Sequence, residues 1–214
     1  MKVIVISDLH LGAGDKRDIF YSDDSLCTFL KAHKDDYIIL AGDITEMWDV
    51  KDVNDIYAGH PKVCSYISYY VDRLIRGNHD NHLIEFCGLP FEDEVVIGDT
   101  VIMHGHLFDF LNSGWRTFIG RALTPATKLL QKIVGREVKR RLRAYFERWG
   151  RHSTGDKYLN AARKYAKEKG YKRVVMGHTH KWETTIEPDF HYLNTGNWIH
   201  GRTGDYQEFE TEEL

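Results

Sequence analysis

The sequence predicts an α/β fold, and two observations carry that prediction. Short apolar runs rich in β-branched residues alternate with helical patterns along the 214 residues. Each apolar run is followed at once by a polar cluster, and glycines in these clusters allow tight turns. The hydrophobic content of 42% and the aromatic content of 13% are typical of a folded globular chain. The runs predicted to be buried strands are Val3–Ser7, Tyr37–Ala41, Arg73–Arg76, Val101–Met103 and Arg173–Met176.

The remaining elements lie between and after these strands. Helical spacing of apolar residues predicts helices over Ser25–Lys34 and Gly59–Val71. Glu94–Val101 is predicted to be a hairpin with its turn at Gly98 and Asp99. Trp182–Ile186 and Phe190–Asn194 are predicted to be a further pair of strands, and the acidic tail Glu208–Leu214 is expected to fray.

One segment breaks this alternation. Residues 113–170 carry sixteen Lys and Arg against four Asp and Glu, whereas the rest of the chain carries thirteen against twenty-eight. Apolar residues recur there at helical spacing. We therefore expect a basic helical insertion, or cap, over 113–170 within a single domain spanning 1–214. Its charge is compatible with an anionic substrate, an anionic surface or a solvated helix face.

Composition also limits the function classes and the compartment. The three cysteines are widely spaced and form no CxxC pair, which argues against a disulfide framework or a thiolate zinc site. The longest apolar runs are strand-length and too short to cross a membrane. Met1 and Lys2 lead straight into an apolar strand without the separate hydrophobic region of a signal peptide, so we expect a cytoplasmic protein.

The polar clusters at the strand ends are expected to converge. The carboxyl ends of parallel strands lie along one edge of a sheet, so residues distant in sequence would share one crevice. Their carboxylate, imidazole and amide groups form a mixed oxygen and nitrogen set that suits Mn, Fe, Zn, Co or Ni. This set is too large for one transition ion and suits two ions that share a bridging carboxylate. The candidate ligands are Asp8, His10, Asp43, Asn78, His104, His178 and His180.

Taken singly, each cluster has a plain structural explanation. An Asp-x-His after a strand is commonly a capping and hydrogen-bonding pair, and a Gly-Asp is mostly a turn. The GHTH stretch could be two surface histidines. A succession of such clusters, each at the end of a predicted strand, is hard to explain by separate accidents.

The motifs together resemble a known family. They are DLH at Asp8, GD at Gly42, GNHD at Gly77, HGH at His104 and GHTH at Gly177. In this order they resemble the calcineurin-like metallophosphoesterases. The resemblance implies a four-layer α-β-β-α sandwich of two mixed β-sheets, with a two-metal site at the strand ends.

The resemblance also implies roles for individual residues. Asp8, His10, Asp43 and His180 would hold one divalent ion, and Asp43, Asn78, His104 and His178 the other, with Asp43 as the bridge. Manganese is the ion expected first, with Fe, Zn, Co or Ni as alternatives. A hydroxide bridging the two ions would attack phosphorus.

Beside the ligands, the resemblance makes His79 the general acid that protonates the leaving oxygen. Asp80 is expected to accept a hydrogen bond from its ring and favour the imidazolium. The plain alternative is a turn histidine satisfied by Asp80. Four residues are candidates for contact with the substrate, although loop support or a solvated helix face also explains them: His106, Asn112, Arg116 and Arg121.

Within the family, the chain resembles the branch of the UDP-2,3-diacylglucosamine diphosphatases through DLHLG, GDITEMWD, HGHLFD and the basic insertion. That branch implies cleavage of the pyrophosphate of a lipid-linked nucleotide sugar, with the cap touching lipid at the inner face of a membrane. Its members carry an arginine where this chain has His79. The departure favours a broader phosphomonoesterase or phosphodiesterase.

Two other classes of function remain open. The basic cap would also suit a nuclease or a nucleic-acid-binding module, although no RNP-like or C2H2 pattern accompanies it. The family also contains metal-binding scaffolds for protein partners. A scaffold would be expected to lack a ligand or the acid, and this sequence keeps them all. We therefore expect an enzyme with an anionic phosphoester substrate.

Overall fold

The computed structural model describes residues 1–20, 22–80, 83–109, 155–199 and 204–212. The chain divides into two compact units, one formed by Met1–Gly105 with Arg163–Leu214 and the other by His106–Ala162. Most of the predicted cap, 113–154, lies outside the described residues, as do Asn112, Arg116 and Arg121. The cap and the single-domain organisation therefore stay predictions.

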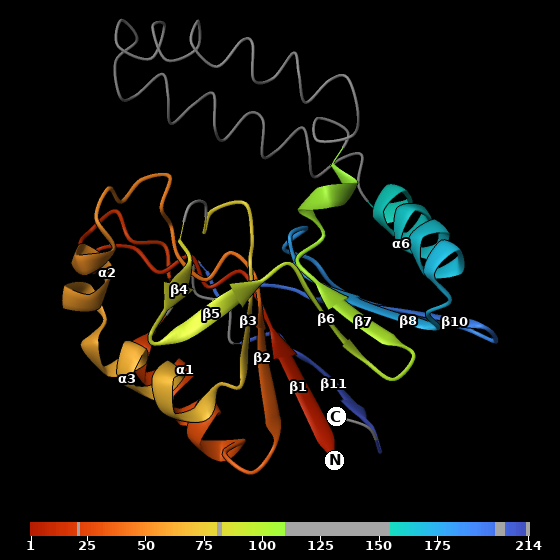
Figure 1. The fold of residues 1–214 in the computed structure, drawn as a ribbon. Coiled ribbons are helices and arrows are strands. Elements are labelled where there is room, and N and C mark those ends of the chain that lie inside the picture. Colours follow the sequence, from red (N-terminus) through yellow and green to blue (C-terminus); the bar gives the residue numbers. More distant parts are fainter. Residues whose placement is uncertain (21, 81–82, 110–154, 200–203, 213–214) are drawn as a thin grey trace, which may run out of the picture. The chain divides into compact units, whose positions relative to one another are not determined.

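The first sheet of the larger unit has six strands in the order β11-β1-β2-β3-β5-β4 (Figure 1). Strands β1 (Lys2–Ile6), β2 (Tyr37–Ala41), β3 (Arg73–Ile75) and β5 (Leu89–Glu92) run parallel. The edge strands β11 (Gln207–Glu210) and β4 (Glu85–Phe86) run antiparallel to their neighbours. The parallel strands thus end at one edge, as expected.

The second sheet has five strands in the order β6-β7-β8-β10-β9. Strands β7 (Thr100–Met103), β8 (Arg173–Met176) and β10 (Phe190–Thr195) run parallel. The edge strands β6 (Glu94–Ile97) and β9 (Trp182–Glu187) are antiparallel. Both sheets are mixed.

Helices flank the sheets. Helices α1 (Asp23–Ala32), α2 (Val53–Gly59) and α3 (Pro61–Tyr70) accompany the first sheet (Figure 1). Helix α1 begins where the Ser22 hydroxyl accepts a hydrogen bond from the Ser25 N–H, at 3.3 Å. Helix α6 spans Gly155–Lys169, and the short 3-10 helix η1 spans His106–Phe108. Tyr165 of α6 donates to Glu94 of β6 at 2.7 Å, which ties that end of α6 to the second sheet.

Alternation along the strands separates two apolar cores. Val3 and Val5 of β1 belong to a core with Ile102, Val175 and Leu193 of the second sheet. Their neighbours Ile4 and Ile6 point the other way and pack in a second core with residues of α1 and α3. Successive side chains of a strand face opposite sides, so the first sheet is covered on both faces. The predicted four-layer α-β-β-α sandwich is confirmed.

The structure corrects several predicted elements. The hairpin is confirmed, with Ile97 paired with Thr100 across its turn. The predicted helix Gly59–Val71 is wrong at its start, because α2 ends at Gly59 and α3 begins at Pro61. The tail does not fray over its first residues. Gln207 and Phe209 are buried while Glu208 and Glu210 are not, and this alternation lets β11 pair with β1.

Two further features of the fold concern the cysteines and the apolar character of the helices. Cys27, Cys64 and Cys87 are free and buried. Within the described ranges, no helix has both the length and the apolar character that crossing a bilayer requires.

Candidate metal centre

The candidate site begins with unusual backbone geometry at the strand ends. Five of its residues have a positive φ although they are not glycine: Asp8 (56°), His10 (52°), Asp43 (50°), His178 (71°) and His180 (56°). Aspartate and histidine tolerate this left-handed region better than most residues, yet each instance still costs on the order of 1 kcal/mol.

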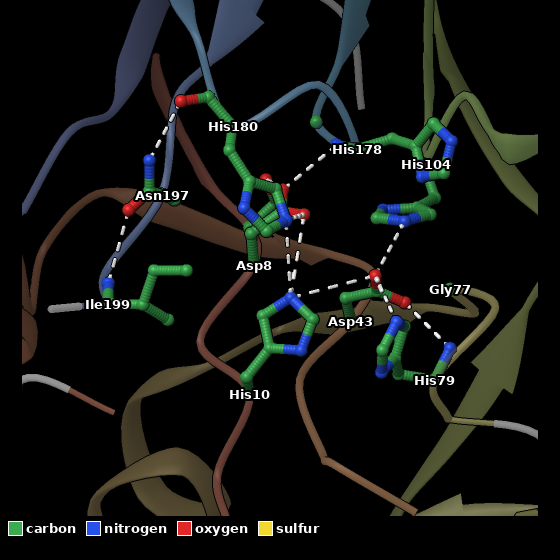
Figure 2. A network of polar contacts seen from close by, with 12 residues as sticks. Asp8, His10, Asp43, Gly77, His79, His104, His178, His180, Asn197 and Ile199 are labelled. Carbon is green, nitrogen blue, oxygen red and sulfur yellow. Dashed lines mark hydrogen bonds and ion pairs between the residues drawn. The ribbon is translucent and has the colours of Figure 1, made fainter. Parts of the chain in front are cut away.

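One group of ligand atoms comes from three loops. Asp8 and His10 follow β1, Asp43 follows β2, and His180 follows β8; one ligand atom of each lies within 4.8 Å of the others. His180 Nε2 lies 3.1 Å from Asp8 Oδ1, and His10 Nε2 lies 3.7 Å from Asp43 Oδ2. Figure 2 shows these side chains pointing toward one another. They can hold one cation.

A second group shares Asp43 with the first. Ligand atoms of Asp43, His104 and His178 lie within 4.8 Å of one another. His104 Nε2 is 3.2 Å from Asp43 Oδ2. The buried Asn78 Oδ1 has no hydrogen-bond partner among the described residues. Its neighbour His79 donates its backbone N–H to Asp43 Oδ1 at 2.8 Å. A buried amide oxygen without a partner is costly, and a cation here would satisfy it.

Backbone hydrogen bonds hold the loops together. Asp8 N–H donates to Gly42 O at 3.0 Å, and His10 N–H donates to Asp43 O at 2.9 Å. His178 N–H donates to Asp8 Oδ2 at 2.9 Å. His104 Nδ1 donates to Ala41 O at 3.0 Å, so that Nε2 is the nitrogen directed at Asp43.

Two glycines are required by close approach. A side chain at Gly77 would overlap the backbone nitrogen and the carboxylate of Asp43. A side chain at Gly177 would overlap the Ser7 hydroxyl and the Asp8 carboxylate. The first residue of GNHD and of GHTH therefore makes room for the carboxylates of the site.

The electrostatics of the site favour a cation. Burial raises the pKa of the Asp8 carboxyl, but His180 and His104 outweigh burial and bring it to about 2. The same opposition, dominated by His104, holds the pKa of Asp43 well below its usual value. Burial lowers the pKa of His104, but Asp43 and Asp8 raise it to about 10. The two carboxylates therefore carry negative charge and favour a positive charge on the neighbouring histidines. Divalent cations would take the place of that positive charge.

His79 has a different partner from the one predicted. Its Nδ1 lies 2.7 Å from Glu46 Oε1, and the other oxygen of Glu46 lies 2.9 Å from His10 Nδ1. The indole of Trp48 stacks on the His79 ring, with centroids 3.8 Å apart. Burial raises the pKa of Glu46, but hydrogen bonds from His10 and His79 hold it below its usual value.

The expected hydrogen bond from His79 to Asp80 is wrong. Asp80 instead accepts from Gly77 N–H at 2.8 Å, from Thr45 N–H at 2.8 Å and from the Thr45 hydroxyl at 2.9 Å. Burial and the neighbouring Asp43 raise the pKa of Asp80 to about 6. Asp80 thus shapes the turn that carries Asn78 and His79.

Sequence reasoning missed Glu46 and Trp48, although a signal was present. Glu46 lies in GDITE, three residues after Asp43, where an acidic side chain leaves the same turn as a ligand. Of the four candidates for substrate contact, only His106 is described, at the start of η1 in the smaller unit. Its role stays a prediction.

The donor set fits two divalent cations. Six of the seven predicted ligand residues converge in two groups that share Asp43, and the seventh, Asn78, has an unpartnered buried oxygen. Carboxylate, imidazole and amide donors suit Mn, Fe, Zn, Co or Ni. The residues present therefore fit the centre that the motifs predict.

Comparison with known proteins places the chain in a family. Residues 1–182 match the model of the calcineurin-like phosphoesterases. The chain belongs to the calcineurin-like phosphoesterase family, as its motifs predicted. A search of curated proteins found no match.

Several solved structures are similar to the chain. A conserved uncharacterized protein of Streptococcus pneumoniae, a predicted phosphoesterase, is 17% identical, with a TM-score of 0.43 over 98% of this chain and 83% of that one. Zinc-bound Vps29 of Entamoeba histolytica is 18% identical, with a TM-score of 0.47 over 100% and 87%. The phosphoesterase Yfce of E. coli is 15% identical, with a TM-score of 0.48 over 99% and 90%.

Proposed function

We propose that this protein is a hydrolase of phosphoester or pyrophosphate bonds that depends on two divalent metal ions. The observation that carries the proposal is the pair of ligand groups sharing Asp43, next to the buried, unpartnered oxygen of Asn78. Asp8, His10, Asp43 and His180 would hold one ion, and Asp43, Asn78, His104 and His178 the other. When bound, the two ions would offset the charge of a phosphate and lower the pKa of the attacking water.

The chain itself supplies a proton donor in His79. Glu46 accepts a hydrogen bond from Nδ1–H of His79. The other ring nitrogen, Nε2, therefore faces the metal centre, 3.9 Å from Asp43 Oδ2. A proton on Nε2 can pass to the leaving oxygen, and the Glu46 carboxylate orients the ring through Nδ1. Trp48 stacks on one face of the ring and donates its indole N–H to Asn78 O at 3.0 Å, which restricts rotation of the imidazole.

The substrate class is the finer part of the proposal. His79 provides an acid for poor leaving groups, so a broad phosphomonoesterase or phosphodiesterase acting on nucleotides is favoured. The motifs DLHLG and GDITEMWD also support activity on a nucleotide-sugar diphosphate with acyl chains, with the basic segment 113–170 near the membrane. The histidine at position 79 argues against this second class.

A substrate panel tests the proposal. Protein freed of metal by a chelator is reloaded with Mn²⁺, Fe²⁺, Zn²⁺, Co²⁺ or Ni²⁺. It is then given p-nitrophenyl phosphate, bis-p-nitrophenyl phosphate and UDP-glucosamine with and without acyl chains. We expect hydrolysis only after reloading, with the lipid-free esters cleaved. Absence of hydrolysis with every metal would refute the proposal, and preference for the acylated substrate would replace the favoured class.

A further inference from the structure

A segment outside the predicted motifs contacts two of the ligand-bearing loops, the one after β1 and the one after β8. Residues Asn194–Trp198, here called the brace, include the end of β10 and the turn after it. Asn194 Nδ2 donates to Gly177 O at 3.0 Å, and Asn197 Nδ2 donates to His180 O at 2.8 Å. Trp198 N–H donates to Asp8 O at 3.1 Å. The brace thus fixes main-chain carbonyls beside both groups of ligands.

Asn197 is itself held at both ends. The residue is 3% exposed. Its Nδ2 donates to His180 O, and its Oδ1 accepts from Ile199 N–H at 3.2 Å. Figure 2 shows the amide between these two partners. A buried amide with both ends bonded has one preferred orientation, and so it fixes the direction of the His180 carbonyl.

His180 has particular need of such a contact. Its backbone is in the left-handed region, with φ at 56°, and its side chain is 34% exposed. The buried ligand His104 is confined by packing, at 1% exposed, and His178 is anchored by its N–H on Asp8 Oδ2. For His180, the hydrogen bond to Asn197 fixes the carbonyl of a strained residue and so restricts the backbone from which its ring reaches Asp8.

We propose that Asn197 is a positioning residue for His180 and sets the affinity of the ion that Asp8, His10, Asp43 and His180 hold. The inference rests on the proposed metal centre. It adds to that centre a residue that is not a ligand but affects the affinity of one ion site and not of the other. The second group of ligand atoms, from Asp43, His104 and His178, does not include His180.

The test is the metal content of full-length variants. Asn197→Asp is nearly isosteric, keeps the acceptor for Ile199 N–H and loses the donor to His180 O. Loss of a contact that orients a ligand commonly costs about 10- to 100-fold in metal affinity. Chelator-treated protein is titrated with Mn²⁺, and bound metal is measured by mass spectrometry and calorimetry. We expect one of the two Mn²⁺ sites to weaken by about that factor while the other keeps its affinity.

Controls separate positioning from folding. Asn54→Asp makes the same change from amide to carboxylate in α2, outside the brace and both ligand groups, where the amide donates to Asp52 Oδ1 at 2.9 Å. This control is expected to keep both affinities. Asn197→Ser removes the amide without adding charge and is used in parallel, in case a buried carboxylate at 197 prevents folding. Melting temperatures of the metal-free proteins establish that each variant is folded.

A double-mutant cycle identifies the site involved. His180→Ala should weaken the same ion, and adding Asn197→Asp to it should cause little further loss, because the carbonyl then positions no ligand. Unchanged affinities in folded Asn197→Asp and Asn197→Ser, equal weakening of both sites, or losses that add to those of His180→Ala would overturn the inference. If the wild type binds fewer than two ions, the metal centre itself is refuted, which is a different result.

Discussion

Among the residues that the structure describes, two buried clusters of histidine and carboxylate differ in how their hydrogen bonds are satisfied. In the first, His60 is 5% exposed, and its two ring nitrogens each lie 2.7 Å from a carboxylate, Nδ1 from Asp23 and Nε2 from Asp18. In the second, the candidate metal centre, ligand atoms from several loops converge on common points and Asn78 Oδ1 has no described partner.

The comparison shows that residue type alone does not identify a metal site. Both clusters place histidine beside aspartate in the interior. The His60 cluster closes on itself, because each nitrogen meets a different carboxylate on opposite sides of the ring. In the metal centre, the donor atoms of several residues converge in two groups that share Asp43. Five of these residues have left-handed backbone. Convergence and strain, which persist only when the surroundings enforce them, distinguish the functional cluster.

The largest expected effect is at the shared carboxylate. Asp43→Asn removes the charge common to both ligand groups, so we expect both ions to be lost and turnover to fall by about 10⁴-fold or more, since each ion contributes several kcal/mol. Metal content and the hydrolysis rate measure this. The matched change in the other cluster, Asp18→Asn, should leave both readouts unchanged. Equal losses in the two variants would remove the distinction between the clusters.

The second effect separates proton donation from metal binding. His79→Gln should keep both ions and lower turnover by about 10²-fold or more on an alkyl phosphate, because the leaving alkoxide needs a proton. The loss should be smaller on p-nitrophenyl phosphate, whose leaving group is stable as an anion. The measurements are turnover on both substrates and metal content. Loss of metal, or equal losses on the two substrates, would show that His79 is not the acid.

A smaller effect is expected at Glu46, which joins the acid to a ligand. Glu46→Gln keeps the size of the side chain and loses the charge between His10 and His79. We expect turnover to fall by about 10- to 100-fold and the ion held with His10 to bind more weakly. Turnover and Mn²⁺ titration measure this. A variant with full turnover would place Glu46 in a purely structural role.

Local pattern predicted the α/β fold and the convergence of its polar clusters, whereas the arrangement in two sheets followed from the resemblance of the motifs to a family. An apolar run followed by Gly, Asp or His marks a strand and its exit, and parallel strands bring those exits together. Glu46, Asn197 and β11 were missed for a different reason. Their roles depend on which loops lie beside them. Glu46 follows Asp43 by three residues, but this spacing alone does not distinguish a partner of His79 from an acidic residue on a solvated turn. The predicted hydrogen bond from the His79 ring to Asp80 was wrong for the same reason. The ring bonds to Glu46 of another loop and not to its neighbour in sequence.

The smallest effect on activity, and the clearest on stability, is expected at His60. Burial lowers the pKa of His60, but hydrogen bonds to Asp18 and Asp23 outweigh it and raise the pKa above its usual value. The charged ring therefore stabilises the fold fully below a pH of about 6.5, and this contribution is lost as the pH rises through the raised folded value. Burial raises the pKa of Asp18, but the hydrogen bond from His60 holds it below its usual value, so the contribution of Asp18 to stability is lost only in acid.

His60→Gln should lower the free energy of unfolding by about 2 kcal/mol at pH 6 and by less at pH 9, with Mn²⁺-dependent turnover unchanged. Denaturant unfolding at the two pH values, with turnover measured beside it, checks this; a loss independent of pH would mean that the ring packs in this cluster as a neutral group.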